Sequence, residues 1–307
     1  MPEHSFVSLD WTHPLVREWF LSKFSAPTEP QVQGWPPILA GKTTLISAPT
    51  GSGKTLAAFM VCIDRLVWLA LAGTLLNQTQ VGYVSPLKAL TNDVQKNLLG
   101  PLQEIQQLAK KLGLTMQDID VLVRTGDTPT YERQKMLKKQ PHILVTTPES
   151  LYLLLTGEKS RAILENIETV IVDEIHALAN NKRGSHLVLS LERLQDLCQR
   201  PFVRIGLSAT QKPIELIGKF LGGSNRPMPV IINIGHQRQL ELHIGVPEQE
   251  LTAIASNTMW DEVYDKLAQL AKENRSILIF VNTRKLAERV AHHLAERLDK
   301  EQVAAHH

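Results

Sequence analysis

The sequence predicts an α/β fold in which a parallel β-sheet is covered by helices on both faces. Short apolar runs rich in β-branched residues recur at 43–48, 81–85, 120–123, 142–146, 169–173, 203–208 and 230–234, and helical patterns separate most of them. Strands that alternate with helices form parallel sheets, whose strands are buried on both faces. With 307 residues, 43% of them hydrophobic, the chain is long enough for one complete domain of this class and part of another.

The first strand, 43–48, leads into a glycine-rich turn that reads APTGSGKT, and an apolar helical pattern follows at 56–70. Gly51 and Gly53 allow successive backbone N–H groups to curl around a phosphate, and the helix N-terminus adds donors and a partial positive charge. We expect Lys54 to contact the β and γ phosphates and the Thr55 hydroxyl to bind Mg²⁺. The common pattern has glycine at the first position of this loop, where this chain has alanine. The residues expected to contact the triphosphate are Ala48, Pro49, Thr50, Gly51, Ser52, Gly53, Lys54 and Thr55.

The later strand 169–173 ends in two carboxylates, Asp173 and Glu174. Because ligands bind beyond the carboxyl ends of parallel strands, we expect these groups to lie near the glycine loop. Asp173 would then hold Mg²⁺ opposite Thr55, and Glu174 would act as the base that orients the attacking water. The predicted catalytic residues are therefore Lys54, Asp173 and Glu174. A solvated acidic turn at the end of a strand is the alternative.

Charge, cysteine content and apolar runs limit the possible partners and location of the protein less strictly than the motifs do. The net charge of +2 is close to neutral, so any nucleic acid must be bound by local groups rather than by a globally basic surface. Cys62 and Cys198 both lie in helical patterns and are predicted to be buried thiols. The longest apolar run, 66–72, is too short to span a bilayer, and the N-terminus has no secretory signal. We expect a soluble, cytoplasmic protein with no membrane partner.

Residues 173–176, DEIH, resemble the DExH box of superfamily 2 helicases. Residues 208–210, SAT, resemble the motif of those helicases that couples ATP hydrolysis to nucleic-acid contacts. This resemblance implies coupling roles for His176, Ser208 and Thr210.

Five more segments resemble helicase motifs in the expected order. SPLKAL at 85–90 and TTPES at 146–150 are similar to the two loops that touch the nucleic-acid backbone, and RTGD at 124–127 is similar to the loop between them. PTEPQ at 27–31 resembles the upstream motif whose glutamine reads adenine, which implies that role for Gln31. ILIFVNTR at 277–284 resembles the first strand of a second RecA-like domain.

The amino-acid sequences of these motifs, including the alanine at position 48, are most similar to those of the large helicase-related (Lhr) family. The resemblance implies an ATP-dependent motor with ATP and Mg²⁺ as cofactors. Its partner would be single-stranded nucleic acid, more readily DNA than RNA, with movement in the 3′ to 5′ direction. Contacts to the backbone rather than to bases imply little sequence preference. The implied nucleic-acid contacts are Pro86, Lys88, Arg124, Thr147 and Pro148.

The resemblance also implies two domains: an ATP-binding RecA-like domain at 1–234, and a linker with an incomplete second RecA-like domain at 235–307. In the second domain we expect a helix at 260–272, a strand at 276–281 and a helix at 285–298. The arginine motif that reaches the γ-phosphate in this family is absent from the 307 residues, and it is worth roughly 10³–10⁵ in rate. We therefore expect Mg·ATP binding with slow turnover, unless the missing half or a partner completes the site.

Two other classes of P-loop protein fit the sequence less well than a helicase does. A GTPase needs an aspartate that the string NKRG at 181–184 lacks. The signature of a transporter ATPase should precede the acidic strand, but the incomplete string LGGS at 221–224 follows it. A non-catalytic remnant of a helicase that binds ATP or nucleic acid stays open as the alternative function.

Overall fold

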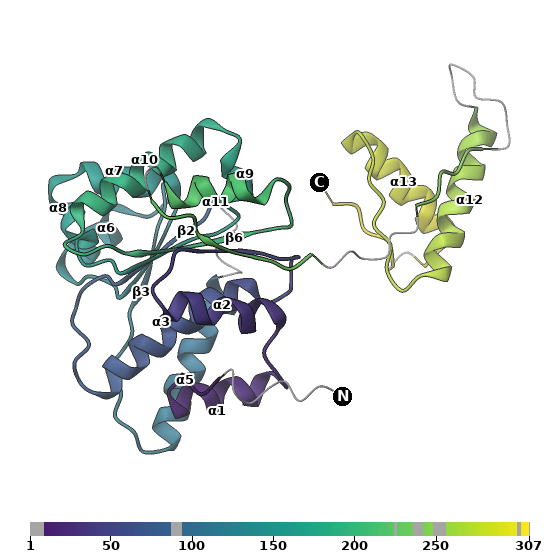
Figure 1. Cartoon of the computed structure of the whole chain (residues 1–307). Helices are drawn as coiled ribbons and strands as arrows, with labels where there is room; N and C mark the ends of the chain where they lie inside the picture. Colours follow the sequence, from purple (N-terminus) through teal and green to yellow (C-terminus); the bar gives the residue numbers. More distant parts are fainter. Residues whose placement is uncertain are drawn as a thin grey trace. The chain divides into compact units, whose positions relative to one another are not determined.

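The computed structural model describes residues 9–86, 94–223, 226–235, 242–247, 256–299 and 302–306. The chain divides into two compact units, residues 1–237 and 238–307 (Figure 1). The functional identities assigned to the segments 1–234 and 235–307 stay predictions.

The first unit contains a seven-stranded sheet with the order β3-β4-β2-β5-β6-β1-β7, and every pair of neighbours is parallel. Each strand falls within one of the seven predicted runs or overlaps it closely, so the predicted fold class is confirmed. The strands are β1 (Thr44–Ser47), β2 (Val81–Val84), β3 (Val121–Arg124), β4 (Ile143–Thr146), β5 (Thr169–Val172), β6 (Val203–Ser208) and β7 (Val230–Asn233).

Helices cover both faces of this sheet (Figure 1). On one face lie α1 (Pro14–Lys23), α2 (Glu29–Leu39), α3 (Lys54–Leu71) and α5 (Gly100–Lys111). On the other lie α6 (Thr130–Lys138), α7 (Pro148–Thr156), α8 (Glu158–Arg161), α9 (His176–Ala179), α10 (Lys182–Leu197) and α11 (Ile214–Gly222). A π-helix spans Gln95–Leu99 and a 3-10 helix spans Ala162–Leu164.

Strand alternation creates two hydrophobic cores. In β1, Leu45 belongs to the core under α7, α10 and α11, whereas the next residue, Ile46, belongs to the core under α2 and α3. Successive side chains of a strand point to opposite faces of the sheet, so a strand covered on both faces is apolar throughout. This is why the predicted strands have continuous apolar sequences.

The strand register gathers the candidate residues at one edge. Ser47 of β1 pairs with Ser208 of β6, and Arg124 of β3 pairs with Thr146 of β4. Because every strand runs in the same direction, all seven carboxyl ends meet along this edge. We call it the carboxyl edge and the opposite one the amino edge.

The second unit contains α12 (Asn257–Glu273) and α13 (Arg284–Arg297), which confirm both predicted helices. They share a small core of Tyr264, Ala268, Val290 and Leu294. The strand predicted at 276–281 is wrong: this segment forms no strand, and no described strand lies in this unit to pair with it. A strand exists through its ladder of hydrogen bonds, so an apolar pattern alone does not create one.

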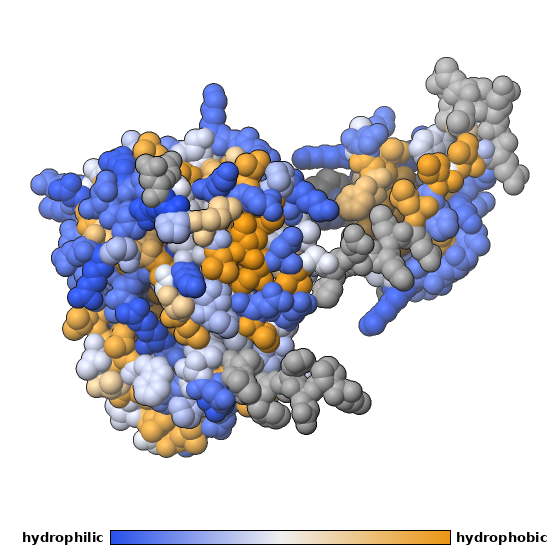
Figure 2. All heavy atoms as spheres, viewed as in Figure 1, coloured by the Kyte–Doolittle hydropathy of each residue, from blue (hydrophilic) through white to orange (hydrophobic). Residues whose placement is uncertain are grey.

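The unpaired segment keeps the alternation of a strand. Ile279 and Val281 pack against the helices, whereas Leu278 and Phe280 are 82% and 89% exposed. Figure 2 shows apolar side chains on the surface of this unit. In the described part of the whole chain, no helix combines the length and apolar character that crossing a membrane requires.

Candidate active site

The glycine loop lies between β1 and α3, as the sequence predicts. Gly51 and Gly53 have φ angles of 80° and 86°, which side-chain-bearing residues rarely adopt. Gly53 is the N-cap of α3, and among the described residues no side chain caps that helix end, so its first N–H groups face the loop unpaired. The Ser52 hydroxyl is buried and also lacks a hydrogen-bond partner within the described ranges. A loop with unpaired donors and two left-handed glycines fits a phosphate group.

Ala48, the variant position of the loop, belongs to the sheet and its core. Its N–H donates to the Ser208 carbonyl at 3.1 Å, which extends the pairing of β1 with β6 by one residue. Its methyl group is fully buried in the core shared with α3. Alanine is therefore accommodated here with ordinary strand geometry.

The buried side chain of Gln31 makes a hydrogen bond to the glycine loop. Its side chain is 3% exposed, its Nε2 donates to the Gly53 carbonyl at 3.4 Å, and its Oε1 accepts from the Thr28 N–H at 2.9 Å. A Cβ atom at Gly53 would lie only 2.9 Å from Gln31 Nε2, and the φ angle of 86° at this position would strain any residue with a side chain. The adenine-reading role of Gln31 stays a prediction.

Asp173 follows β5 and is 5% exposed. Burial raises the pKa of its carboxyl group, while hydrogen bonds and the nearby charge of Lys54 act in the opposite direction. Oδ1 accepts from the Glu174 N–H at 2.8 Å, and Oδ2 accepts from the Tyr83 hydroxyl. Lys54 is itself 5% exposed, so a buried cation and a buried carboxylate face the same region.

Tyr83 is a site residue that the sequence reasoning missed. It lies in the middle of β2, where its residue type indicates a core aromatic, and it packs against Phe59 with ring centroids 4.9 Å apart. Only the pairing of β2 with β5 brings its hydroxyl to Asp173. Nothing in a single strand sequence reports which strand is its neighbour.

Glu174 has a φ angle of 46°, and it is the single non-glycine residue with a positive φ in the described part of the chain. Such backbone strain is concentrated at functional sites. Its Oε2 lies 3.2 Å from His176 Nε2, and His176 Nδ1 accepts from the Ala209 N–H at 3.2 Å. Because Nδ1 is an acceptor, Nε2 carries the proton of the neutral ring and donates to Glu174.

The segment 208–210 is therefore linked to Glu174 through the His176 ring, which accepts from a backbone N–H of this segment. Ser208 is fully buried and its hydroxyl donates to the Ala209 carbonyl at 2.8 Å, while Thr210 is exposed. Ala209, whose N–H reaches His176, was not singled out in the sequence. A backbone donor leaves no mark on residue type, so only the fold could identify it.

The donor set fits Mg²⁺ bound together with phosphate. Thr55 is half-buried in the first turn of α3, and Asp173 lies at the end of β5. No group of three or more His, Cys, Asp or Glu side chains suited to a metal occurs among the described residues. Mg²⁺ commonly binds through one or two protein oxygens plus substrate phosphates rather than in an all-protein cage.

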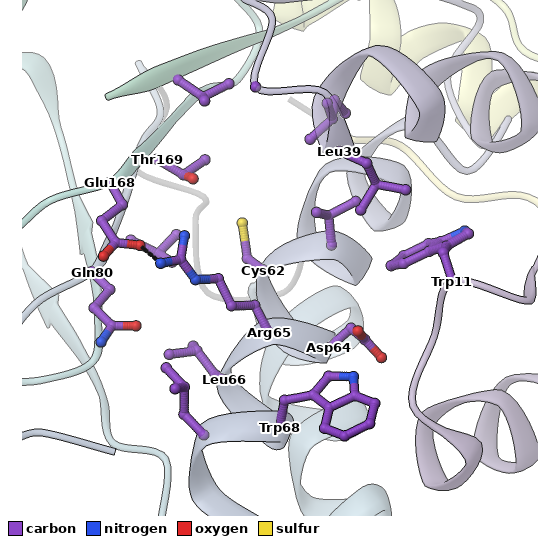
Figure 3. A pocket seen from close by; sticks show the side chains of 16 residues that line it. Trp11, Leu39, Cys62, Asp64, Arg65, Leu66, Trp68, Gln80, Glu168 and Thr169 are labelled. Atoms are coloured by element: carbon purple, nitrogen blue, oxygen red, sulfur yellow. Dashed lines mark ion pairs between the residues drawn. The ribbon is translucent and has the colours of Figure 1, made fainter. Parts of the chain in front are cut away.

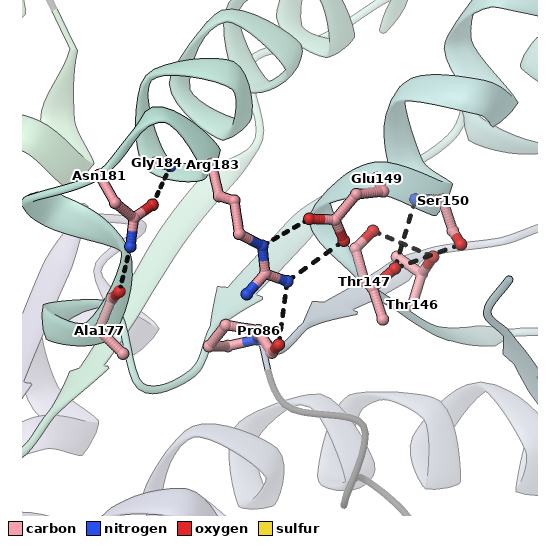
Figure 4. A network of polar contacts seen from close by, with 9 residues as sticks. All are labelled: Pro86, Thr146, Thr147, Glu149, Ser150, Ala177, Asn181, Arg183 and Gly184. Carbon is pink, nitrogen blue, oxygen red and sulfur yellow. Dashed lines mark hydrogen bonds and ion pairs between the residues drawn. The ribbon is translucent and has the colours of Figure 1, made fainter.

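The implied nucleic-acid contacts lie at the ends of β2, β3 and β4. Thr146 Oγ1 donates to the Arg124 carbonyl at 2.7 Å. Thr147, directly before Pro148, caps α7: its Oγ1 accepts from the Ser150 N–H at 3.3 Å, a contact drawn in Figure 4. Arg124 is 9% exposed; its Nη1 donates to the Thr125 carbonyl, and burial lowers its pKa. Lys88 lies outside the described residues.

Arg183, at the start of α10, connects two of these strand ends (Figure 4). Its Nε lies 2.6 Å from Glu149 Oε1, and its Nη2 donates to the Pro86 carbonyl at 3.0 Å. This ion pair lowers the pKa of Glu149. The sequence reasoning missed Arg183, because an arginine near a helix start has no distinguishing pattern.

A parallel sheet with a glycine loop after β1 and a strained acidic turn after β5 defines a P-loop domain of the RecA-like type. A family profile described as DEAD/DEAH box helicase matches residues 28–217, and the chain belongs to this family. The predicted membership of the DEAD/DEAH-box helicases is thereby confirmed, while the roles of the individual motif residues stay predictions.

Relatives narrow the resemblance to the Lhr group. The chain is 47% identical over 298 residues to the ATP-dependent helicase Lhr-Core protein 2 of Thermococcus barophilus, covering 95% of this chain and 34% of that protein. It is 40% identical to the Lhr helicase/uracil glycosylase of Escherichia coli, covering 96% of this chain and 20% of that protein. The chain thus spans about a third or less of the length of these relatives.

Solved structures of helicases are also similar to this chain. The Mycobacterium smegmatis helicase Lhr bound to ssDNA and AMP-PNP matches with a TM-score of 0.78 and 45% identity, over 94% of this chain and 36% of that one. The DEAD-box helicase Mss116 bound to ssRNA shares the fold with a TM-score of 0.67 at 17% identity.

Proposed function

We propose that this chain is the nucleotide-binding part of an Lhr-like helicase that binds Mg·ATP, hydrolyses it and moves 3′ to 5′ on single-stranded DNA. The observation that carries the proposal is that Lys54, Asp173 and Glu174 lie together beside a glycine loop whose buried Ser52 hydroxyl has no hydrogen-bond partner among the described residues. Each of these residues matches a helicase motif, and the chain belongs to a helicase family.

In the proposed reaction, the loop N–H groups and the Lys54 ammonium bind the β and γ phosphates. Thr55 and Asp173 would hold Mg²⁺, which neutralises the charge that develops on the transferred phosphoryl group. Tyr83 holds the Asp173 carboxylate in one orientation through its hydroxyl. The Ser52 hydroxyl, buried and without a partner among the described residues, is a further donor for a phosphate oxygen.

Glu174 would orient the attacking water and accept its proton. The His176 Nε2–H donates to one of its oxygens, 3.2 Å away, and leaves the other oxygen for water. His176 is in turn held by the Ala209 N–H. We infer that ATP hydrolysis is coupled to the bound nucleic acid through these successive contacts of Glu174, His176 and Ala209.

Single-stranded DNA is proposed as the substrate because the Lhr structure that shares 45% identity with this chain was determined with ssDNA and AMP-PNP. The helix N-terminus at Pro148 and the strand ends at Pro86 and Arg124 offer groups of the type that contact a phosphate backbone. The direction of movement follows from the family resemblance alone.

The 307-residue polypeptide is expected to bind Mg·ATP and to turn it over slowly. The resemblance assigns the arginine that reaches the γ-phosphate to a motif that these 307 residues do not contain, and its loss is worth roughly 10³–10⁵ in rate. The alternative function is a non-catalytic module that binds ATP or nucleic acid.

The deciding experiment compares wild type with Glu174→Gln. Binding of a fluorescent Mg·ATP analogue and of a labelled oligo-dT strand is measured for both, together with single-turnover ATP hydrolysis. We expect Glu174→Gln to retain both binding affinities within about twofold and to reduce hydrolysis by about 10²–10⁴-fold. Equal hydrolysis rates in the two proteins would favour the non-catalytic module, and an absence of ATP binding in wild type would refute the proposal.

A further inference from the structure

The loop that follows β3 carries two arginines, Arg124 at its start and Arg133 in the helix α6 behind it. Arg124 Nη1 donates to the Thr125 carbonyl at 2.9 Å. Arg133 Nε donates to the Thr128 carbonyl at 2.7 Å, and its Nη2 donates to the Gly126 carbonyl at 2.8 Å. Both guanidinium groups therefore lie on the same short loop.

These two charges have no counter-ion in the part of the chain that the structure describes. No described carboxylate, Asp127 of the same loop included, forms an ion pair with either guanidinium. Burial lowers the pKa of Arg124, and so does the positive charge of Arg133. Like charges that act on each other favour an anion beside them.

Two other arginines of this unit show the usual arrangement. Arg65 pairs with Glu168 at the amino edge (Figure 3). Arg204, the other buried arginine among the described residues, pairs with Glu192 at 2.9 Å, and its unpaired Nε and Nη2 have no contact with solvent. Arg124 is 9% exposed, and its unpaired Nε and Nη2 are not among the buried atoms without a partner. A ligand can therefore reach the free donors of Arg124.

The loop is closed by its own hydrogen bonds and has open space beside it. The Thr125 N–H donates to Thr128 Oγ1 at 2.9 Å, and the Thr128 N–H donates to the Thr125 carbonyl at 3.3 Å. A Cβ atom at Gly126 would meet no heavy atom within 4 Å. Arg133 is half-buried, and its Nη1 is a further donor without a partner in the described ranges. The donors of both arginines thus border a preformed, accessible loop.

The ligand that suits two guanidinium groups is a phosphate, whose oxygens match their planar forks. In the sheet, β3 is five strands away from β1, which leads into the glycine loop. Neighbouring strands are about 4.8 Å apart, so the two loops are separated by about 24 Å, too far for the phosphates of one bound ATP to serve both. By contrast, β4 is the direct neighbour of β3, and the proposed contacts Thr147 and Pro148 follow β4. A phosphate of the nucleic-acid backbone is the anion expected here.

We propose that Arg124 and Arg133 together bind one backbone phosphate of a single-stranded nucleic acid, which makes Arg133 a further contact of that site. This inference rests on the proposed function, since it adds a residue to the proposed nucleic-acid site. DNA and RNA share the phosphate group, so this contact holds either strand and reads no bases.

The salt dependence of strand binding tests the role of Arg133. Each phosphate contact to a single strand adds about 0.7 to the slope of log affinity against log salt concentration. Binding of labelled oligo-dT to the 307-residue chain is followed by fluorescence anisotropy between about 50 and 200 mM KCl. Arg133→Gln should lower the slope by about 0.7 and the affinity at 0.1 M by about fivefold. Lys138→Gln, which removes an exposed charge at the other end of α6, should leave the slope unchanged.

A second pair of variants leaves both arginines in place. Gly126 has no positive φ angle and has free space around it, so it tolerates a side chain. Gly126→Asp introduces a carboxylate beside the two guanidinium groups and should weaken oligo-dT binding by about fivefold or more. Gly126→Asn has the same size without the charge and should bind like wild type. Unchanged melting temperatures and Mg·ATP affinities would establish that the variants are folded.

A folded Arg133→Gln protein that keeps the wild-type slope would overturn this inference, even if its affinity fell equally at every salt concentration, because Arg133 would then only support the loop. Equal binding by Gly126→Asp and Gly126→Asn would also overturn it, and this pair decides if Arg133→Gln does not fold. Both results would leave the proposed function standing.

An oligo-U strand separates this inference from the choice of DNA. If wild type bound oligo-U but not oligo-dT, and Arg133→Gln lowered the slope for oligo-U, the phosphate contact would stand and the DNA substrate would be refuted. If wild type bound neither strand, the proposed function and this inference would both fail.

Discussion

Each edge of the sheet in the 1–237 unit buries a carboxylate, Asp173 at the carboxyl edge and Asp64 at the amino edge, and the surroundings of the two differ. At the carboxyl edge, Lys54 and Asp173 are each 5% exposed beside a loop with unpaired donors. At the amino edge, Asp64 is equally buried, but its carboxylate accepts from the His13 N–H, and Glu168 is paired with Arg65.

This difference separates a functional charge from a structural one. A buried charge becomes a candidate for catalysis when strained backbone and unpaired donors surround it, as at Glu174 and Ser52. A buried charge whose partners are all within the protein contributes to stability and its pH dependence instead. Burial and a shifted pKa are common to both edges, so they do not identify the active site by themselves.

The largest expected effect is at the carboxyl edge. Lys54→Ala should weaken Mg·ATP binding by about 100-fold or more, because it removes a buried cation from charged phosphates. Isothermal titration calorimetry measures this, and Lys42→Ala, an exposed lysine before β1, is the matched control. Undiminished ATP binding by Lys54→Ala would mean that the glycine loop is not the nucleotide site.

The free energy of unfolding should depend on pH through the Asp64 carboxyl group at the amino edge. Burial raises the pKa of Asp64 from 3.8 to about 6. Because the folded-state pKa lies above the unfolded one, the fold favours the protonated form, and the stabilising contribution present below about pH 4 is lost as the pH rises through 6. From pH 4 to 7, the free energy of unfolding of wild type should fall by about 1–3 kcal/mol relative to Asp64→Asn.

Urea unfolding at several pH values tests this expectation, with the exposed Asp196→Asn as the control. Parallel stability curves for wild type and Asp64→Asn would contradict it. Mg·ATP affinity at neutral pH should be the same in both proteins, since Asp64 lies at the edge away from the loop.

The next largest effect is expected from loss of the hydrogen bond between the Tyr83 hydroxyl and Asp173. Tyr83→Phe removes the hydroxyl that donates to Asp173 Oδ2 and should raise the Mg²⁺ concentration needed for ATP binding by about tenfold, as is typical when a partner of a metal ligand is lost. Mg²⁺ titrations at fixed ATP analogue measure it. Tyr131→Phe, which alters a tyrosine that is 69% exposed, should have no effect. Identical Mg²⁺ dependence in wild type and Tyr83→Phe would show that this hydrogen bond does not influence the metal.

The smallest expected effect concerns the nucleic-acid end of the carboxyl edge. Arg183→Lys keeps the charge but loses the fork that joins Glu149 to the Pro86 carbonyl. Both side chains of the pair are about half exposed, so the expected loss in oligo-dT affinity is only about threefold or less. Fluorescence anisotropy at one salt concentration measures it, with Arg200→Lys as the control. A loss of Mg·ATP binding in Arg183→Lys would contradict the separation of the two functions along this edge.

Local sequence was sufficient for the elements and for the residues of the main motifs. Seven apolar runs became seven strands because residues buried on both faces of a sheet must be apolar. The glycines of the loop were identifiable because left-handed backbone at Gly51 and Gly53 requires that residue type. The same logic failed at 276–281, where the apolar pattern is present and no described strand of that unit pairs with it.

The sequence by itself thus determined which residues carry charge, which backbone positions need glycine and which segments must be buried. Only the tertiary structure decided which of them meet: Tyr83 with Asp173, the Ala209 N–H with His176, and Arg183 with Glu149. Each of these contacts joins residues that are 33 or more positions apart in the sequence, and the order of strands that brings them together is a property of the whole fold. A hydrogen bond from a backbone group or across neighbouring strands has no signature in the residues near it, so it becomes visible only when the sheet is assembled.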